Sequence, residues 1–317
     1  MKKLLSLPII MFSFLAVGQT LEGVNLEHLS VSNIYPQAEI SKNALPVQQI
    51  ALRTGVTLEY VEQGDAKGTV VVLLHGFSDS WHSYETVLPH LPSELHVFAI
   101  SQRGHGNSSK QANSYLPHDF AADVAAFLQV KNVKEAVIVG HSMGSTIAQC
   151  FAVNYPAMTK ALVLAGSFAD YSSPAVTEFK MVVHGLSDPV DSTFIAEFQK
   201  STILKPTPGL SLDSIIAESR KLPAKVWKGV AAGWKVSDFR KQLAAFGKPS
   251  LIIWGNKDLF CPFKDQDELH GLLKASQLVI YEDVGHALHW EEPERFAKDL
   301  QHFIRLNRLN DETETKN

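Results

Sequence analysis

Uninterrupted apolar runs alternate with segments of helical periodicity through the first half of the chain. The runs TVVVLLHG (69–76), HVFAIS (96–101) and EAVIVG (135–140) contain almost no polar position. Such runs are typical of parallel strands that are buried on both faces. The segments PHDFAADVAAFLQV (117–130) and SMGSTIAQCFAVNY (142–155) have apolar residues at helical spacing. We therefore expect two helices among three strands.

The same alternation continues in the second half. Strands are expected at KALVLAGS (160–167), KPSLIIWG (248–255) and SQLVIYED (276–283), with helices at DQDELHGLLK (265–274) and EPERFAKDLQHFIRL (292–306). Strand and helix succeeding one another predicts right-handed crossovers and a sheet covered on both faces. The expected fold class is therefore α/β, with a mostly parallel, doubly wound sheet.

Two segments depart from this alternation. QQIALR and VTLEYVE, joined around Gly55, alternate with the period of an antiparallel hairpin. Residues 169–248 contain short helical pieces, five prolines and several aromatic residues, but no buried-strand run. The segment is too long for a loop in a compact domain. We interpret it as a helical cap inserted into a core formed by residues 48–168 and 249–307.

The N-terminus has the pattern of an export signal. Two lysines precede an apolar run from Leu4 to Val17, which ends in small residues. The run is short for a membrane span and contains a proline. Residues 1–18 are expected to be a cleaved signal peptide, residues 19–47 a linker or arm, and residues 308–317 a polar tail. The mature protein would be periplasmic or secreted; an uncleaved membrane anchor is the alternative.

Composition narrows the function classes. The 317 residues have a net charge of -4 and 45% hydrophobic content, with no basic stripe for nucleic acid. Neither GxGxxG nor GxxxxGK[ST] is present, so nucleotide binding has no support. The partner is expected to be a small-molecule substrate, and nothing indicates an oligomeric state. Cys150 and Cys261 are too few for a disulfide framework and are expected to be free thiols.

The stretch VIVGHSMGSTIAQC places Ser142 between two glycines, where an apolar strand run meets a helical pattern. A strand-turn-helix of this kind exposes a serine hydroxyl above a sheet. A polar residue in a tight turn is the competing interpretation. The hydroxyl becomes a nucleophile only if a base takes its proton and a third group orients the base.

Two later loops offer these partners. Asp258 in WGNKD and His286 in VGHALHW each follow an expected strand, so both should lie with Ser142 at the carboxyl edge of the sheet. The order is nucleophile, acid, base. His289 competes as the base, but it lies on the way into the final helix. The competing acids are Asp283, Asp265 and Asp267.

A tetrahedral intermediate also needs backbone N–H donors. These usually come from the residue after the nucleophile and from the loop after the third strand. Met143 occupies the first position, and Phe77 in HGFSDSW occupies the second.

These motifs together resemble the capped, lipase-like serine hydrolases of the α/β-hydrolase fold. The resemblance covers about residues 50–306, through LHGF (74–77), RGHGNSS (103–109), GHSMG (140–144), WGNKD (254–258) and GHALHWEEPERF (285–296). It implies nucleophile, acid and base at Ser142, Asp258 and His286, with oxyanion amides at Phe77 and Met143. The serine excludes the aspartate-based dehalogenase and epoxide hydrolase mechanisms of the family. Ser145 departs from a second glycine common in the family.

Other polar and aromatic residues show weaker signs of a functional role. His75, His105 and Arg103 lie in turns that mostly carry structural hydrogen bonds in this fold. Aromatic candidates for a substrate pocket are Trp81, Trp227 and Trp234, although core packing is the ordinary role of such residues. His286 and His289 lack a HExxH or carboxylate-rich partner run, so no metal is expected, and no cofactor is indicated.

The expected function is that of a serine hydrolase acting on a small to medium, fairly apolar carboxylic ester. A lactone, an amide or a carbon-carbon bond could be cleaved by the same triad. Cofactor-free perhydrolase or haloperoxidase activity needs no extra residue type. A ligand sensor with slow turnover is an alternative of another class.

Overall fold

The computed structural model describes residues 45–110 and 114–309. Eight strands form one sheet in the order β1-β2-β4-β3-β5-β6-β7-β8. The strands are β1 (Gln48–Ala51), β2 (Thr57–Gly64), β3 (Val70–Leu74), β4 (His96–Ser101), β5 (Ala136–His141), β6 (Thr159–Ala165), β7 (Ser250–Gly255) and β8 (Ser276–Tyr281). β1, β2 and β4 pair antiparallel, and every other pair is parallel. The predicted hairpin and mostly parallel sheet are confirmed.

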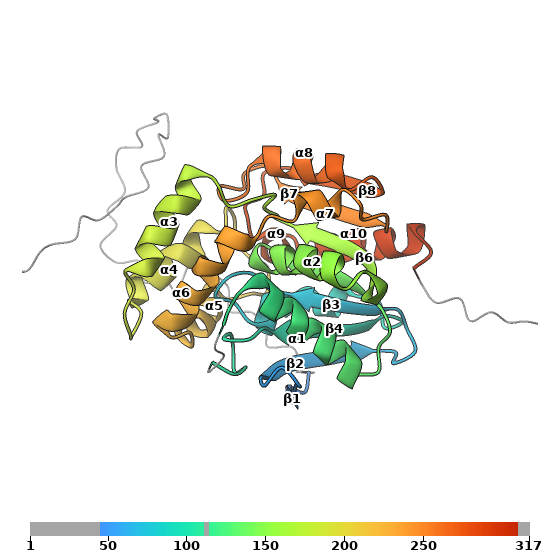
Figure 1. Cartoon of the computed structure of the whole chain (residues 1–317), viewed down its shortest axis with the longest axis horizontal. Coiled ribbons are helices and arrows are strands. Elements are labelled where there is room, and N and C mark those ends of the chain that lie inside the picture. Colours follow the sequence, from blue (N-terminus) through green and yellow to red (C-terminus); the bar gives the residue numbers. More distant parts are fainter. Residues whose placement is uncertain (1–44, 111–113, 310–317) are drawn as a thin grey trace, which may run out of the picture. The chain divides into compact units, whose positions relative to one another are not determined.

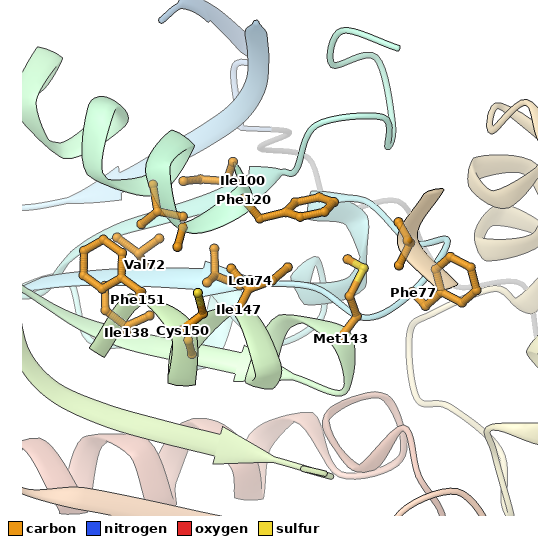
Figure 2. Close-up of a cluster of buried hydrophobic side chains, with 14 of the residues drawn as sticks. Val72, Leu74, Phe77, Ile100, Phe120, Ile138, Met143, Ile147, Cys150 and Phe151 are labelled. Atoms are coloured by element: carbon orange, nitrogen blue, oxygen red, sulfur yellow. The ribbon is translucent and has the colours of Figure 1, made fainter. Parts of the chain in front are cut away.

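Side chains alternate between two buried layers along each central strand. Val72 and Leu74 of β3 belong to a cluster with the helices α1 (Pro117–Val130) and α2 (Met143–Asn154), which we name the α2-side core. Figure 2 shows these side chains against α2, with Phe77 and Met143 at one end of the cluster. Val71 and Leu73 face the opposite way, toward α10 (Pro293–Leu306), in the α10-side core. The sheet is therefore doubly wound, as predicted.

The helix α10 illustrates how the pattern determines the element. Pro293 occupies its first turn, where a missing N–H costs no hydrogen bond. Phe296, Leu300, Phe303 and Ile304 recur at helical spacing and are buried against the sheet. The remaining core helices are α8 (Phe263–Leu272) and α9 (Leu288–Glu291), with short 3₁₀ turns η2 (Trp81–Tyr84), η3 (Leu88–His90) and η4 (Pro156–Met158).

The segment between β6 and β7 forms the predicted helical insertion. It contains α3 (Pro174–His184), α4 (Ser192–Ser201), α5 (Leu212–Arg220), α6 (Ala224–Gly233), η5 (Trp234–Val236) and α7 (Arg240–Leu243). Figure 1 shows α3 to α6 gathered beyond one end of the sheet. α7 instead packs on α2 and α8 of the core. Helices α3 to α6 constitute the cap in the following description.

The predicted signal peptide, most of the linker and most of the polar tail lie outside the described residues. Among the residues that the structure does describe, no helix is long and apolar enough to cross a membrane.

Candidate active site

Ser142 lies at the junction of β5 and α2 in a backbone conformation that side chains rarely adopt. Its φ is 53° and its ψ is -117°. A positive φ of this kind costs about 1–3 kcal/mol and persists only where surrounding contacts enforce it. One such contact is the Ser142 N–H, which donates to the Ala165 carbonyl of β6 at 3.0 Å. The parallel ladder thus extends to the serine itself, and the chain then reverses into α2.

The two glycines beside Ser142 are needed for close approach. A Cβ built on Gly140 would lie 2.1 Å from the carbonyl oxygen of Gly144. One built on Gly144 would lie 2.1 Å from the carbonyl oxygen of Leu74. Strand, turn and helix therefore meet at backbone contact distance. Ser145, the departure from the family pattern, donates from its hydroxyl to the Ser142 carbonyl at 2.6 Å, and the same oxygen lies 2.9 Å from Ser167 Oγ.

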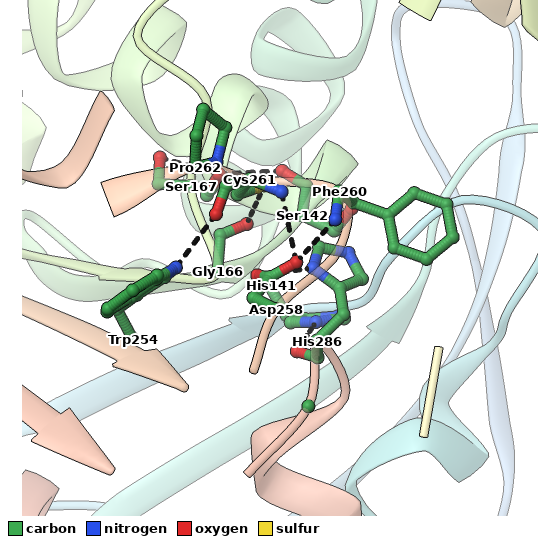
Figure 3. A network of polar contacts seen from close by, with 12 residues as sticks. His141, Ser142, Gly166, Ser167, Trp254, Asp258, Phe260, Cys261, Pro262 and His286 are labelled. Carbon is green, nitrogen blue, oxygen red and sulfur yellow. Dashed lines mark hydrogen bonds and ion pairs between the residues drawn. The ribbon is translucent and has the colours of Figure 1, made fainter. Parts of the chain in front are cut away.

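Asp258 and His286 come together at the ends of the neighbouring strands β7 and β8. His286 Nδ1 lies 2.8 Å from Asp258 Oδ2, and the Asp258 side chain is fully buried. Asp258 Oδ1 accepts two backbone N–H groups, from Phe260 at 2.8 Å and from Cys261 at 3.0 Å. A carboxylate with its other oxygen held in this way can only accept from Nδ1. Neutral His286 then carries its proton on Nδ1 and leaves Nε2 free as a base. Figure 3 shows Ser142 at the same strand ends.

A second histidine fixes the loop that carries His286. His141, the residue before Ser142, lies with Nε2 3.0 Å from the His286 carbonyl oxygen. A carbonyl only accepts, so Nε2 is the donor and the ring is in its Nε2–H form. Burial holds the pKa of His141 well below its usual range. His141 is therefore a neutral donor at physiological pH, and it ties the loop of the candidate base to the turn of the candidate nucleophile.

The loop after β3 presents the Phe77 N–H in a fixed direction. His75 Nδ1 donates to the Gly76 carbonyl at 2.7 Å, and His75 Nε2 accepts the Gln102 N–H at 3.0 Å. The Gly76 carbonyl and the Phe77 N–H belong to one planar trans peptide, so the N–H points away from the His75 ring. Burial lowers the pKa of His75, which keeps this pattern of donor and acceptor. The structural roles expected for His75 and for His105, which bonds the Arg103 carbonyl, agree with these contacts.

The two candidate oxyanion donors have no competing acceptor in their turns. Among the loop and turn hydrogen bonds of residues 45–110 and 114–309, none uses the N–H of Phe77 or of Met143. Met143 begins α2, where the first N–H groups of a helix have no partner within it.

Asp79 was not identified from the sequence, although it lies two residues beyond Phe77. It is 2% exposed, and burial raises its pKa to about 7. Hydrogen bonds from Gln199, Ser83 and the Gly76 backbone, together with the charge of His286, act in the opposite direction and lower this pKa. A carboxyl group that titrates near neutrality thus lies behind the Phe77 loop. Its only signal in the sequence is its position within HGFSDSW.

Aromatic side chains surround Phe77 on the cap side. Its ring makes edge contacts with Phe179, Phe198, Trp227 and Trp234, at centroid distances from 4.8 to 6.4 Å. We name these five residues the aromatic wall. A cavity of about 10 Å³, the least that holds one water, lies where Trp234 meets Met143 and Tyr171.

The three tryptophans proposed for the pocket do not gather in one place. Trp227 and Trp234 belong to the aromatic wall, whereas Trp81 packs in the α10-side core. The Trp81 backbone N–H donates to Ser101 Oγ, and its ring stacks on His82 at 3.9 Å. The short turn η2 directs this residue into the core, so its packing gives no support for a role in the pocket.

The competitors of the candidate triad lie elsewhere. His289 is fully buried, with Nε2 2.9 Å from Ser83 Oγ, and burial lowers its pKa to about 3. The Asp283 side chain is 84% exposed, beside Lys257. Asp265 accepts the Ala169 N–H at 3.2 Å. None of these three contacts is with His286.

One further group has the spacing of metal ligands. Potential ligand atoms of Asp258, Cys261 and His286 lie within 4.8 Å of one another. Each already has a protein partner: Asp258 and His286 pair together, and the Cys261 thiol donates to the Gly166 carbonyl at 3.1 Å. Burial raises the pKa of Cys261 well above its usual range, so the thiol keeps its proton. Cys150 and Cys261 are both buried free cysteines, as expected from the sequence.

Comparison with known proteins identifies the family of the chain. Residues 69–207 and 219–293 match the sequence profile of the family described as alpha/beta hydrolase fold. The chain belongs to the α/β-hydrolase fold family. Lipase 1 of Psychrobacter immobilis is 25% identical to this α/β-hydrolase over 303 residues, which cover 92% of the chain and 94% of the lipase. A pimeloyl-(acyl-carrier protein) methyl ester esterase of Neisseria meningitidis is 30% identical over 251 residues, covering 74% of the chain and 92% of the esterase.

Solved structures show the same fold. An esterase from Exiguobacterium antarcticum superposes on this α/β-hydrolase with a TM-score of 0.73 at 22% identity, over 81% of the chain and 98% of the esterase.

Proposed function

We propose that this α/β-hydrolase cleaves small to medium, apolar carboxylic esters through a covalent acyl-enzyme on Ser142. One observation carries the proposal: a serine in a left-handed strand-to-helix turn lies at the strand ends where His286 Nδ1 pairs with Asp258 at 2.8 Å. Support for an ester comes from the relatives, which are described as a lipase and a methyl ester esterase.

The chemistry follows from the hydrogen bonds of the site. Nε2 of His286 takes the Ser142 proton as Oγ attacks the ester carbonyl, and Asp258 stabilises the imidazolium that forms. The N–H groups of Phe77 and Met143 stabilise the oxyanion of the tetrahedral intermediate. Collapse of this intermediate breaks the bond to the alcohol, which leaves with the proton from His286. Water then attacks the acyl-enzyme by the same steps, with His286 again as base, and releases the acid.

The aromatic wall supports an apolar acyl group of limited length. Its rings offer apolar contact, with one ammonium group, that of Lys180, 5.8 Å from the Trp234 ring centroid, and the cavity beside Met143 is small. An apolar acyl chain gains about 0.8 kcal/mol for each methylene that it buries, until the available space ends. We expect kcat/KM to rise from acetate to a short or medium chain and then to fall.

A panel of substrates tests the proposal. The purified protein is assayed with p-nitrophenyl esters from acetate to palmitate, beside lactones, anilides and peracid formation from acetate and added hydrogen peroxide. Labelling by a fluorophosphonate is followed in parallel. Ser142→Ala should abolish both ester turnover and labelling, whereas Ser214→Ala, at an exposed serine of α5, should leave both unchanged.

Other outcomes identify other functions. Turnover of lactones or anilides well above that of all esters would replace the ester by that substrate class, and peracid formation in excess would indicate a perhydrolase. Labelling at Ser142 without turnover of any substrate would indicate a ligand sensor. A folded protein that does not label would refute the nucleophile.

We also propose that the enzyme is exported, with residues 1–18 removed and no stable membrane insertion afterwards. The support is the charged and apolar pattern of these residues. Intact mass measured on protein from the exported fraction should show a chain that begins near residue 19. A full-length chain retained in the membrane fraction would indicate the anchor instead.

A further inference from the structure

Gln199 is a cap residue whose side chain reaches into the core. It lies on α4 and is 1% exposed. Its Nε2 lies 3.0 Å from Asp79 Oδ1 and 3.1 Å from Ser78 Oγ, both on the loop that carries Phe77. The same nitrogen lies 2.8 Å from Ser219 Oγ on α5 of the cap. One amide group therefore joins two cap helices to the loop after β3.

The loop that Gln199 contacts needs an external constraint. Ser78 has a φ of 65°, in the left-handed region that is unfavourable for a side chain. Its neighbour Phe77 supplies the candidate oxyanion amide. On the core side, the Gly76 carbonyl is held by His75 at 2.7 Å. On the cap side, the loop residues immediately after Phe77 are held by Gln199. The Phe77 peptide thus lies between one anchor from the core and one from the cap.

The contact between Gln199 and Asp79 supplies a hydrogen bond that a buried carboxyl group needs. A buried carboxyl group requires hydrogen-bond donors, and losing one from such a group costs more than losing a surface contact. Gln199, Ser83 and the Gly76 backbone are donors to Asp79, and His286 is an ionisable group that interacts with it electrostatically. His141 Nδ1 also lies close by, since a Cβ placed on Gly76 would meet both this nitrogen and Asp79 Oδ2, and the Asp79 carboxyl group interacts electrostatically with Tyr84. Gln199 is the one member of this set that the cap supplies.

We propose that Gln199 is a positioning residue that makes the geometry of the oxyanion hole depend on the docking of the cap. With the cap seated, its amide holds Ser78 and Asp79, and the Phe77 N–H is aimed at the oxyanion. With the cap displaced, the loop loses this donor and the strained turn at Ser78 relaxes. The inference rests on the proposed function, because it assigns Gln199 to the same oxyanion hole.

The test compares Gln199→Met with a variant that removes a cap contact remote from the loop. Methionine has a similar length and volume but no donor. The matched control is Lys205→Met, which removes the ion pair between cap Lys205 and core Glu292 at 2.5 Å. Gln199→Asn serves as a second variant that keeps the amide on a shorter side chain, should the methionine variant fail to fold. Thermal unfolding is recorded for each.

Three quantities separate positioning from loose packing. These are kcat and KM for a p-nitrophenyl ester, and Ki for a trifluoromethyl ketone, which adds to the serine to form an oxyanion. Removal of one oxyanion donor costs about 10²–10³-fold in kcat. A displaced donor should cost less, so we expect kcat of Gln199→Met to fall about 10–100-fold and Ki to rise by a similar factor, with KM changed less than about threefold. Lys205→Met should leave kcat and Ki within about twofold.

The outcomes distinguish the two proposals. If wild type hydrolyses no ester, or if Ser142→Ala retains its rate, the proposed function and this inference both fail. If wild type is active and Ser142→Ala is not, a Gln199→Met variant with kcat and Ki within twofold of wild type overturns this inference alone. Equal losses in Gln199→Met and Lys205→Met, or a rise in KM alone, would also overturn it, because they indicate general loosening of the cap.

Discussion

The substitution Asp258→Asn tests the candidate triad at one pair of atoms. It keeps the size of the side chain and replaces one carboxylate oxygen by an NH₂ group. The structure determines which of the two oxygens the NH₂ group replaces. Oδ1 accepts the N–H groups of Phe260 and Cys261 at 2.8 and 3.0 Å, so an NH₂ group there would face two donors. The amide must therefore place its oxygen toward the backbone and its NH₂ toward His286 Nδ1.

The expected loss follows from this orientation. An NH₂ group facing Nδ1 requires Nδ1 to accept, so the neutral ring carries its proton on Nε2 and cannot take the proton of Ser142. The corresponding change in the serine protease triad lowers kcat about 10⁴-fold. We expect a fall of about 10³–10⁴-fold here, or about 4–5.5 kcal/mol of transition-state stabilisation. KM should change little, because no substrate contact is altered.

The assay is kcat and KM for the best p-nitrophenyl ester at several pH values, with the unfolding transition as a check on folding. Asp283→Asn is the matched control, since the Asp283 side chain is 84% exposed only three residues before His286. It should retain kcat within about twofold. The reasoning is refuted if Asp258→Asn keeps kcat within about tenfold of wild type, or if Asp283→Asn shows the larger loss.

Three further predictions concern stability and reactivity. Gly144→Ala should lower the free energy of unfolding in urea by about 3 kcal/mol or more, because its Cβ would lie 2.1 Å from a carbonyl oxygen of β3; Gly271→Ala, in open space on α8, should be neutral or slightly stabilising. Burial raises the pKa of Asp79 to about 7, so the folded protein keeps this proton at pH values at which the unfolded chain has already lost it. The free energy of unfolding therefore falls as pH rises from about 4 toward neutrality. Relative to Asp79→Asn, wild type should lose at most about 4 kcal/mol between about pH 4 and pH 8, and a flat difference would contradict the assignment. Cys150 and Cys261 should not react with Ellman's reagent in the native protein, and two thiols should appear in denaturant, because both are fully buried and burial raises both pKa values.

The fold could be predicted because its signals are local. Apolar runs such as VVVLL of β3 are long enough to specify buried strands, and the glycines around Ser142 mark a turn where backbones touch. The places of Asp258 and His286 followed from the order of strands in such a sheet, because parallel strands end at one edge. Their roles in catalysis remain predictions until the variants are measured.

Contacts between distant segments could not be predicted in the same way. Gln199 and Asp79 are 120 residues apart, and neither has a pattern that refers to the other. Trp81, Trp227 and Trp234 are alike in the sequence, because an aromatic ring is as well suited to a core as to an apolar pocket. Packing between distant segments determines which side of the sheet each ring faces. The periodicity of a single sequence does not reveal this packing.

The two buried layers of the sheet differ in whether they contain residues of the cap. Cap residues such as Ile195, Val226 and Trp227 belong to the α2-side core, and no residue of α3 to α6 is among the buried members described for the α10-side core. Substitutions that share no contacts are close to additive in their effect on stability. Substitutions at these cap positions should therefore combine almost additively with substitutions deep in the α10-side core, so the stability that this layer supplies stays intact when the cap is changed.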